Sequence, residues 1–472
     1  MKKISYKDKT YNKEEELKFV INTYIFPLLG MYDNNLLFIS KKDFLNLDEK
    51  LRHNKIFYYN NKIFFVPYTD KPLGCYINVS EKYSNVNFNL VNVVLKCLLD
   101  VFYNDINSSS KMKNIYGSFN QCLVNYDYAV QNAICSYLNG DGDENKINDL
   151  LQKLEWWSSK TYEGKKVPFG FIICKNVKGD NGINYIDFLE DDFSATITDG
   201  ITSIIFLDRN CKFIKYESIV KENTIEGCEL INCLPIRFAQ TITMFTKNND
   251  IGIFLLSNGD IVIAKNQKIE FVKRNGKWSN FSYSSFSNYM SMDLNCFEIK
   301  DTLFKEVFSS SLDVSFAHSG GIIAVVDYET RKDKINEVLS KSDDFTIEIS
   351  DEELQDELKT HGDSYFAIMK KIRKRKIILN LLKNIKEKEL NFTFVDRRLR
   401  MELISMDGAT IIDKKGKIIS FGAIIQNDKG SSGGGRGAAA KKLSNYGGFA
   451  IKISTDGYIE VYIEGKLRYS IK

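Results

Sequence analysis

The feature that most constrains this sequence is a glycine tract that runs directly into an alanine-rich segment. Ser431 and Ser432 precede three consecutive glycines and Arg436, and GAAAKKLS follows at once. Glycine allows tight backbone bends whereas alanine and lysine favour helix, so this tract predicts a loop that opens into a helix. The β-branched and aromatic segments KIISFGAII and FAIKIS flank it. The carboxyl-terminal region therefore predicts strand, loop, helix and strand in that order.

A loop of this kind at the start of a helix suits a phosphate group. Its glycines let consecutive backbone N–H groups point at the ligand, and the helix end adds partial positive charge. An arginine in the first turn opposes the helix dipole unless an anion lies beside it. The alternative is a flexible loop that only turns the chain, and the phosphate site is the preferred hypothesis. It would comprise Ser431, Ser432, Gly433, Gly434, Gly435 and Arg436.

A second candidate group is Asp407-Gly408-Ala409, between the helical pattern RRLRMELISM and the strand pattern ATIID. A carboxylate at such a junction can hold a metal ion or accept a proton from a hydroxyl. Asp-Gly is also one of the commonest turn signals. A similar pattern at Asp199-Gly200 has no glycine tract after it, so it predicts only a turn at the start of a strand.

Length and composition set the wider frame. The 472 residues carry 65 basic and 61 acidic side chains, and this near-neutral balance argues against a general nucleic-acid coat. A hydrophobic content of 43% excludes a disordered chain. The length suggests about three domains. Changes in pattern place them at 1–155 (α+β, role unknown), 156–299 (β-rich, regulatory or scaffold) and 300–472, with a helical insertion near 345–390.

The amino-terminal residues have no apolar core and so do not form a secretory signal. The most apolar stretch, Leu90–Tyr103, is interrupted by Lys96 and Asp100, which predicts a core helix and not a membrane span. We therefore expect a cytoplasmic protein with no membrane partner. Two aromatic runs in Lys55–Tyr68 predict a β-hairpin around Asn60-Asn61.

The run Lys370–Lys376 holds six basic residues in seven. Acidic blocks alternate with it along the chain, a pattern typical of a solvated helical face. A nucleic-acid scaffold is the minor alternative, and the lack of interleaved aromatic residues counts against it.

Considered together, residues 300–472 resemble the diadenylate cyclase domain, the nucleotide-binding domain of the DNA-integrity scanning protein and its relatives. LDVSFAHSGGIIAVV (Leu312–Val326) is similar to the helix and Gly-Ala-strand of the family, and Asp407–Ala409 matches its Asp-Gly-Ala motif. GGRGAAA (Gly434–Ala440) is similar to its Gly-Thr-Arg-His-Arg-Ala-Ala motif. AIKISTDGYIEVY is similar to its last strand, turn and strand. The resemblance implies an α/β (α+β) fold in which helices flank a mixed β-sheet.

The resemblance also implies an activity. Members of the family bind ATP in two domains placed face to face, and each 3′-hydroxyl attacks the α-phosphate of the other ATP. Two pyrophosphates leave and cyclic di-AMP forms, with Mg²⁺ or Mn²⁺ as cofactor, so we expect a homodimer or larger homo-oligomer. The implied catalytic residues are Asp407, Gly408, Ala409 and Arg436. Ser454 and Thr455 join the glycine tract in nucleotide binding, and Asp407 and Asp456 are the implied metal ligands.

This sequence departs from the family at two positions of the arginine motif. Gly437 stands where the family has histidine, and Ala438 stands where it has a second arginine. His318, Arg397 and Arg398 are candidates to replace them, but the preferred interpretation is a structural histidine at 318 and surface arginines at 397 and 398. Two functions therefore stay open: a divergent diadenylate cyclase, or a nucleotide-sensing module that binds ATP or a cyclic dinucleotide without turnover and regulates the amino-terminal domains.

Overall fold

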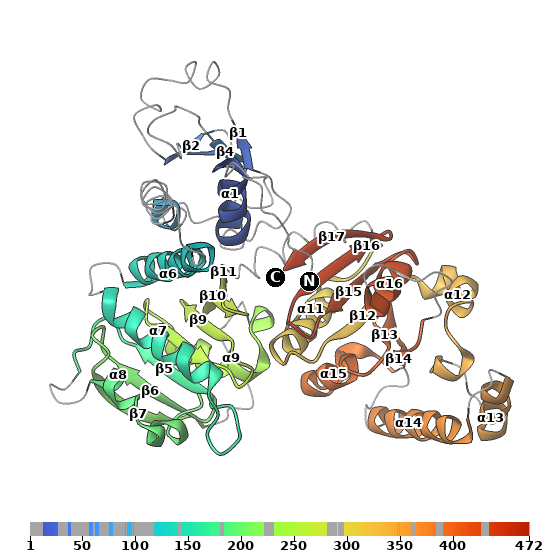
Figure 1. Ribbon diagram of the computed structural model, residues 1–472. Coiled ribbons are helices and arrows are strands. Elements are labelled where there is room, and N and C mark those ends of the chain that lie inside the picture. Colours follow the sequence, from blue (N-terminus) through green and yellow to red (C-terminus); the bar gives the residue numbers. More distant parts are fainter. Residues whose placement is uncertain are drawn as a thin grey trace, which may run out of the picture. The chain divides into compact units, whose positions relative to one another are not determined.

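The protein is mixed α/β in the computed structural model shown in Figure 1. It describes residues 13–26, 36–38, 56–59, 62–65, 75–78, 90, 92–96, 98, 118–139, 144–179, 184–220, 231–280, 290, 297–346, 348, 350–360, 364–383, 390–425 and 434–471. The chain forms two compact units. The first unit comprises residues 1–223 and 241–285, and the second comprises 224–240 and 286–472. The division into three domains stays a prediction.

The first unit begins with helix α1 (Lys13–Val20), which continues as the π-helical turn η1 (Ile21–Ile25). A four-stranded antiparallel sheet has the order β1 (Leu36–Phe38), β4 (Cys75–Asn78), β3 (Lys62–Phe65) and β2 (Ile56–Tyr59). The predicted hairpin is confirmed, because Tyr59 pairs with Lys62. Leu90, Val94 and Leu98 of the predicted core helix are helical and buried. Helices α6 (Ser118–Asn139) and α7 (Glu144–Ser159) follow.

The larger sheet of the first unit has seven strands in the order β11-β10-β9-β8-β5-β6-β7. Their bounds are β5 (Phe169–Ile173), β6 (Ser203–Leu207), β7 (Phe213–Ser218), β8 (Ile251–Leu255), β9 (Ile261–Lys265), β10 (Lys268–Arg274) and β11 (Lys277–Asn280). Short helices α8 (Tyr185–Phe188) and η3 (Asp192–Thr196) lie between β5 and β6. Along the chain, the turn η4 (Ile231–Cys233) of the second unit and helix α9 (Ile236–Phe245), which begins in the second unit and ends in the first, precede β8. Residues 156–299 were expected to be β-rich, and strands β5–β11 lie within that range, whereas helix α9 was not expected.

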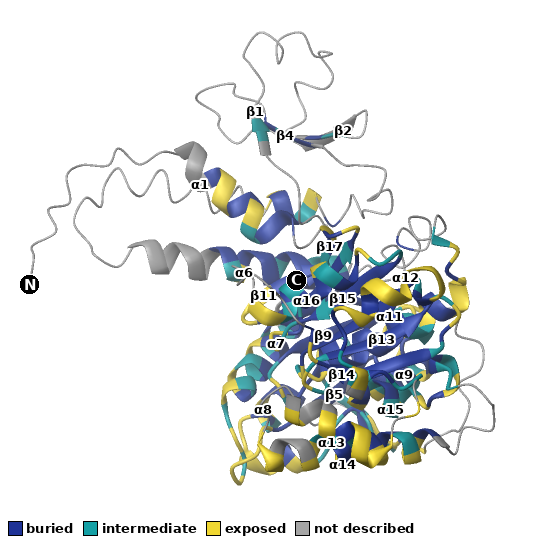
Figure 2. Ribbon diagram, turned by 90° about the vertical axis from the view of Figure 1, so that its right-hand side faces the viewer, coloured by how far each residue is buried: buried dark blue, intermediate teal, exposed yellow. Residues whose placement is uncertain are grey.

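The sheet of the second unit has six strands in the order β14-β13-β12-β15-β16-β17. They are β12 (Gly321–Val326), β13 (Ala409–Asp413), β14 (Ile418–Ala423), β15 (Phe449–Ile453), β16 (Ile459–Ile463) and β17 (Lys466–Ile471). Its helices are α11 (Asp301–Phe316), α12 (Tyr328–Asn336), η6 (Lys341–Asp343), α13 (Asp351–Thr360), α14 (Tyr365–Lys383), η7 (Phe392–Phe394), α15 (Arg397–Ile404) and α16 (Gly434–Leu443). The central strands β12, β13 and β15 are buried along almost their whole length, and β13 is dark blue in Figure 2.

The two sheets share one topology. In the first unit β5 runs parallel to β6 and antiparallel to β8, and in the second β12 runs parallel to β13 and antiparallel to β15. Every other neighbouring pair in both sheets is antiparallel, and only β11 has no counterpart. The shared strand order places Asp199-Gly200 before β6 as Asp407-Gly408 stands before β13.

The carboxyl-terminal pattern is largely confirmed, with one correction. Strands β13 and β14 pair across the turn at Lys414–Gly416, and β15 pairs with β16 across the Thr455–Gly457 turn. Gly434 and Gly435 were expected in the loop, but α16 begins at Gly434; Arg436 lies in the first turn of this helix, as expected. Ser431, Ser432 and Gly433 lie outside the described residues. Among the described residues, no helix combines the length and apolar character of a membrane span.

Candidate functional site

Four chain segments meet at one edge of the second-unit sheet. Because β12 and β13 are parallel, their amino ends lie side by side, and Gly320 and Gly408 come directly before them. The antiparallel neighbours end at the same edge: Ile453 of β15 pairs with Gly321, and Ala423 of β14 pairs with Ala409. Gly320, Gly408, Gly422 and Thr455 mark this edge, which we call the glycine corner.

Arg436 lies over the Gly320 side of the glycine corner. A Cβ on Gly320 would lie 2.6 Å from Arg436 Nη1 and 3.2 Å from Thr455 Cγ2. The guanidinium therefore packs directly on the Gly320 backbone beside Thr455. Gly320 has a φ of +68°, a backbone conformation that glycine adopts without strain. Arg436 and Thr455, which sequence analysis named, are thus brought together by α16 and the β15–β16 turn.

Asp407 and Gly408 form the centre of the glycine corner. Gly408 has a φ of +104°, and a Cβ there would lie 2.6 Å from the carbonyl oxygen of Gly422. Only glycine fits this close backbone approach. The exposed Asp407 carboxylate accepts no hydrogen bond from any described residue, and its charge acts on the ammonium group of Lys374. Ala409 is fully buried in the core, so its side chain serves packing.

The predicted residues of the β15–β16 turn divide into two kinds. The Ser454 hydroxyl accepts a hydrogen bond from the Tyr458 N–H at 3.1 Å and so stabilises the turn. Ser315 of α11 donates to the Gly457 carbonyl at 2.5 Å and ties the turn to that helix. Thr455 and Asp456 are exposed. A bound molecule could therefore reach Thr455 and Asp456 more readily than Ser454.

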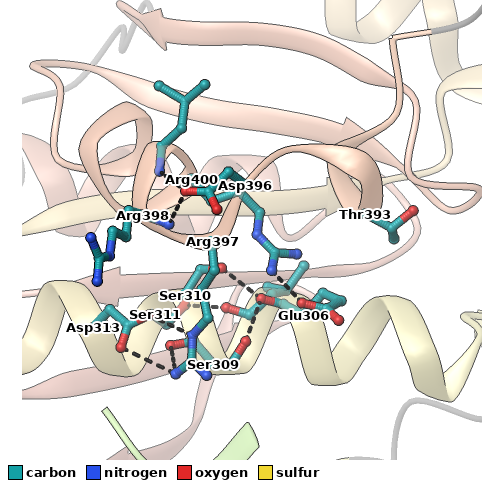
Figure 3. A network of polar contacts seen from close by, with 12 residues as sticks. Glu306, Ser309, Ser310, Ser311, Asp313, Thr393, Asp396, Arg397, Arg398 and Arg400 are labelled. Atoms are coloured by element: carbon teal, nitrogen blue, oxygen red, sulfur yellow. Dashed lines mark hydrogen bonds and ion pairs between the residues drawn. The ribbon is translucent and has the colours of Figure 1, made fainter. Parts of the chain in front are cut away.

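Arg397 does not reach the glycine corner, because a buried carboxylate holds it elsewhere (Figure 3). Its Nε and Nη2 donate to Asp313 at 2.7 and 3.1 Å, and Nη2 also donates to the Leu234 carbonyl at 2.7 Å. Asp313 additionally accepts the Ile236 N–H at 2.7 Å. Burial raises the pKa of Asp313, and the Arg397 charge opposes this rise. The pair clamps α15 to α11 and leaves Arg397 no role at the corner.

A second ion pair of the same network joins Arg400 of α15 to Glu306 of α11. Burial lowers the pKa of Arg400, and the Glu306 charge opposes that shift. Asp396 caps α15 by accepting the Arg398 N–H at 2.9 Å, while the Arg398 side chain is exposed. Because α15 leads directly to Asp407, these contacts fix the approach of the chain to the glycine corner.

Lys374 of α14 is a residue of the corner that sequence reasoning missed. Its Nζ donates to the Gly422 carbonyl at 3.1 Å, and a Cβ on Gly422 would collide with it. The basic run was expected to be a solvated face, but Ile372 and Arg375 within it are buried. The helical spacing of Lys374 and the buried Ile378, four positions apart, is the signal that could have placed Lys374 inward.

The two departures from the family motif leave no polar side chain in their place. Gly437 lies within α16, and a Cβ there would lie 3.9 Å from the Tyr462 hydroxyl. Tyr462 donates to Glu460 at 2.9 Å, and burial followed by the Glu460 carboxylate raises the pKa of Tyr462 to about 12. His318, at the end of α11, is half-buried with a φ of +53°.

A divalent ion would find few protein ligands here. Within the part of the chain that the structure describes, no three His, Cys, Asp or Glu residues gather as a metal site. Magnesium at nucleotide sites takes one or two carboxylates and completes its shell with water and phosphate oxygens. The exposed carboxylates of Asp407 and Asp456 fit that requirement only together with a bound nucleotide.

Comparison with protein-family models, with curated proteins and with solved structures finds no match for this chain. The functional argument therefore depends on the glycine corner itself.

Proposed function

We propose that the second unit binds ATP at the glycine corner and is a divergent diadenylate cyclase that condenses two ATP molecules into cyclic di-AMP and two pyrophosphates. One observation carries the proposal: a guanidinium, three glycines that place no side chain between the strands, and an exposed carboxylate gather at one sheet edge. Arg436 lies on Gly320, and Asp407 precedes Gly408 in the next strand. These are an anion donor set beside a group that can take a proton.

Different residues of the chain would bind the phosphates and accept the proton. The Arg436 guanidinium and the N–H groups of the first turn of α16 would bind phosphate oxygens. Asp407, free of hydrogen bonds from the described residues, would accept the proton of a 3′-hydroxyl or hold Mg²⁺ or Mn²⁺ with Asp456. The ion would neutralise phosphate charge when bound. Since each hydroxyl attacks the partner nucleotide, turnover would require a second copy of this unit in a homodimer or larger assembly.

A nucleotide sensor without turnover is the second candidate, because Gly437 and Ala438 bring no side chain able to bind phosphate. Loss of such a contact removes transition-state stabilisation while ATP binding through Arg436 persists. In that case the second unit would report bound ATP or cyclic dinucleotide to the rest of the chain.

Calorimetric titration of the full chain with ATP and Mg²⁺ tests the binding. We expect saturable binding that Arg436→Met weakens about tenfold or more, since a charge-assisted contact is lost. Arg237→Met is the matched control, because Arg237 is exposed in the first turn of α9, the helix that precedes β8 along the chain as α16 precedes β15. If the wild type binds no ATP, neither the cyclase nor an ATP sensor is correct, and a cyclic-dinucleotide sensor would have to be tested by titration with cyclic di-AMP.

Incubation with ATP and Mg²⁺ or Mn²⁺, followed by chromatography, separates the two candidates. Cyclic di-AMP that forms with the wild type and not with Asp407→Asn supports the cyclase. Saturable ATP binding with no product under either metal supports the sensor.

A further inference from the structure

We propose that Lys374, on the inserted helix α14, is a second phosphate-binding cation of the glycine corner. This inference rests on the proposed nucleotide binding and deepens it. It gives the inserted segment between β12 and β13 a role in that site. It also supplies a second cation from another helix, since Arg436 is the one basic residue among Gly434–Ala440 of α16.

Contacts with the Gly422 backbone place the Lys374 ammonium group beside Gly408 and Asp407. Its Nζ hydrogen-bonds to the Gly422 carbonyl at 3.1 Å, and Gly422 is the residue whose backbone lies against Gly408. A Cβ on Gly422 would also lie 2.9 Å from the Asp407 carbonyl oxygen. Lys374 therefore borders the same backbone surface that carries the Asp407 carboxylate.

The insertion is docked firmly enough to present this side chain. The Phe345 N–H donates to the Ile419 carbonyl of β14 at 2.7 Å, which ties the start of the insertion to the edge strand. The buried Arg375 donates to the Asp344 carbonyl at 2.9 Å, and its guanidinium lies 5.2 Å from the centre of the Phe345 ring. Because Arg375 follows Lys374 directly, these contacts hold Lys374 in place.

The electrostatics favour an anionic ligand. An ammonium group has three N–H donors, and Gly422 is the one hydrogen-bond acceptor of Lys374 among the described residues. Burial lowers the pKa of Lys374, the charges of Asp343 and Asp407 oppose this, and Lys371 and Lys370 add to it. A half-buried cation with unused donors gains most from a further negative group.

The geometry also matches a phosphate chain. Neighbouring strands lie about 4.8 Å apart, so Gly320 and Gly422, on strands separated by β13, bracket roughly 10 Å. Arg436 lies at one side of this span and Lys374 at the other. Two cations at this separation suit a di- or triphosphate more than a single phosphate.

Titration of the full chain with ATP tests the inference. We expect Lys374→Met to weaken ATP binding about tenfold or more, Lys374→Arg to retain most of the affinity, and Lys370→Met, which removes an exposed cation one turn earlier, to change nothing. We also expect the dependence of ATP affinity on salt concentration to become shallower in Lys374→Met, which a merely structural lysine would not cause.

A wild-type experiment keeps the inference testable if Lys374→Met does not fold. Lysine acetylation with a chemical reagent, followed by mass spectrometry, should show Lys374 protected by saturating ATP while Lys370 is not. Unchanged ATP affinity in Lys374→Met, or equal acetylation of Lys374 with and without ATP, would overturn the role of Lys374 and leave the proposed function intact. Absence of ATP binding by the wild type would overturn both.

Discussion

The two larger sheets of this protein place an Asp-Gly pair at the same point of the same topology, yet they use the aspartate differently. In the first unit Asp199 accepts the N–H groups of Ile201 and Thr202 at 2.8 and 2.7 Å, together with the Thr202 hydroxyl at 3.0 Å. In the second unit Asp407 accepts no hydrogen bond from the described residues. One carboxylate is committed to its own turn, and the other is presented to solvent.

The residues around the two Asp-Gly pairs also differ: those around Asp199-Gly200 close the turn, and those around Asp407-Gly408 carry positive charge. A Cβ on Gly170 would lie 2.7 Å from the Gly200 amide nitrogen, and Thr241 of α9 donates to the Gly200 carbonyl at 2.9 Å. The corresponding corner of the first unit, around Asp199-Gly200, is thus closed by backbone and hydroxyl contacts. The second carries two cations, Arg436 and Lys374, beside its glycines. The comparison shows that the two units share a strand topology and an Asp-Gly corner, while the groups around the corner differ: hydrogen bonds close the first, and two cations and an exposed carboxylate lie at the second.

The largest effect we expect concerns what holds the second corner in place. Arg397→Leu leaves the Asp313 carboxylate buried without its cation and should cost about 3–5 kcal/mol of unfolding free energy, measured by denaturant titration. Arg398→Leu, at the exposed neighbouring position, should cost less than about 0.5 kcal/mol. If both variants match the wild type, the α11–α15 clamp does not stabilise the second unit.

The same variant should show a characteristic pH dependence. The folded-state pKa of Asp313 is raised above its unfolded value of about 3.9, and loss of Arg397 removes the charge that opposes this rise. Such a group contributes stability that is present below the unfolded pKa and lost as the pH rises through the folded pKa. The deficit of Arg397→Leu should therefore shrink as the pH falls towards 4.

Replacing each aspartate by alanine should change the unfolding free energy by different amounts, with an intermediate loss for Asp199 and almost none for Asp407. Asp199→Ala removes an acceptor of several turn hydrogen bonds and should cost about 1–2 kcal/mol of unfolding free energy, discounted for partial exposure. Asp407→Ala should leave stability within about 0.5 kcal/mol of the wild type. Equal losses in denaturant titrations of the two variants would mean that both carboxylates are structural.

Acid should reduce the cost of Asp199→Ala. Burial opposes the charge on Asp199, but the Thr202 and Ile201 N–H groups outweigh it and lower the pKa of Asp199. Its contribution is present above the unfolded pKa of about 3.9 and is lost as the pH falls through the folded value. Below that pH the variant and the wild type should become equally stable, whereas a constant difference would contradict this explanation.

The smallest effect we expect concerns α16, the helix beside the glycine corner. Gly437→Ala should stabilise the second unit by about 0.5–1 kcal/mol, because glycine is a poor residue inside a helix and its Cβ would make only an ordinary contact with Tyr462. Thermal unfolding measures the gain. A loss of stability in this variant would mean that α16 packs more tightly at Gly437 than the structure indicates.

Local patterns predicted much of the second unit. The alternation of helix, Asp-Gly, strand, turn and strand between Arg397 and Ile471 was visible because each element carries its own propensity and turn signals. The phosphate hypothesis for Arg436 also came from local chemistry, since an arginine at a helix start breaks a local rule. The contact of Arg436 with Gly320, by contrast, joins residues more than a hundred positions apart and leaves no local pattern.

The features that the sequence did not predict also depend on contacts between distant residues. Helix α9 is rich in the same β-branched and aromatic residue types as the neighbouring strands, and it is too short for its helical period to stand out. Gly434 and Gly435 have low helix propensity, but the start of α16 includes them. Lys374 was hidden in a basic run because charge alone does not say which side of a helix packs inward. Arg397 likewise gave no sign that Asp313 would hold it.

The backbone contact between Gly408 and Gly422 has a consequence for divergence within this lineage. Neither position can gain a side chain without displacing the other strand, so the two glycines are expected to persist together through descent. Arg436 and Lys374 are under no such steric constraint, so a descendant without the proposed nucleotide site could replace both. The two glycines would then indicate common descent, and the two cations would indicate that the proposed nucleotide site had been kept.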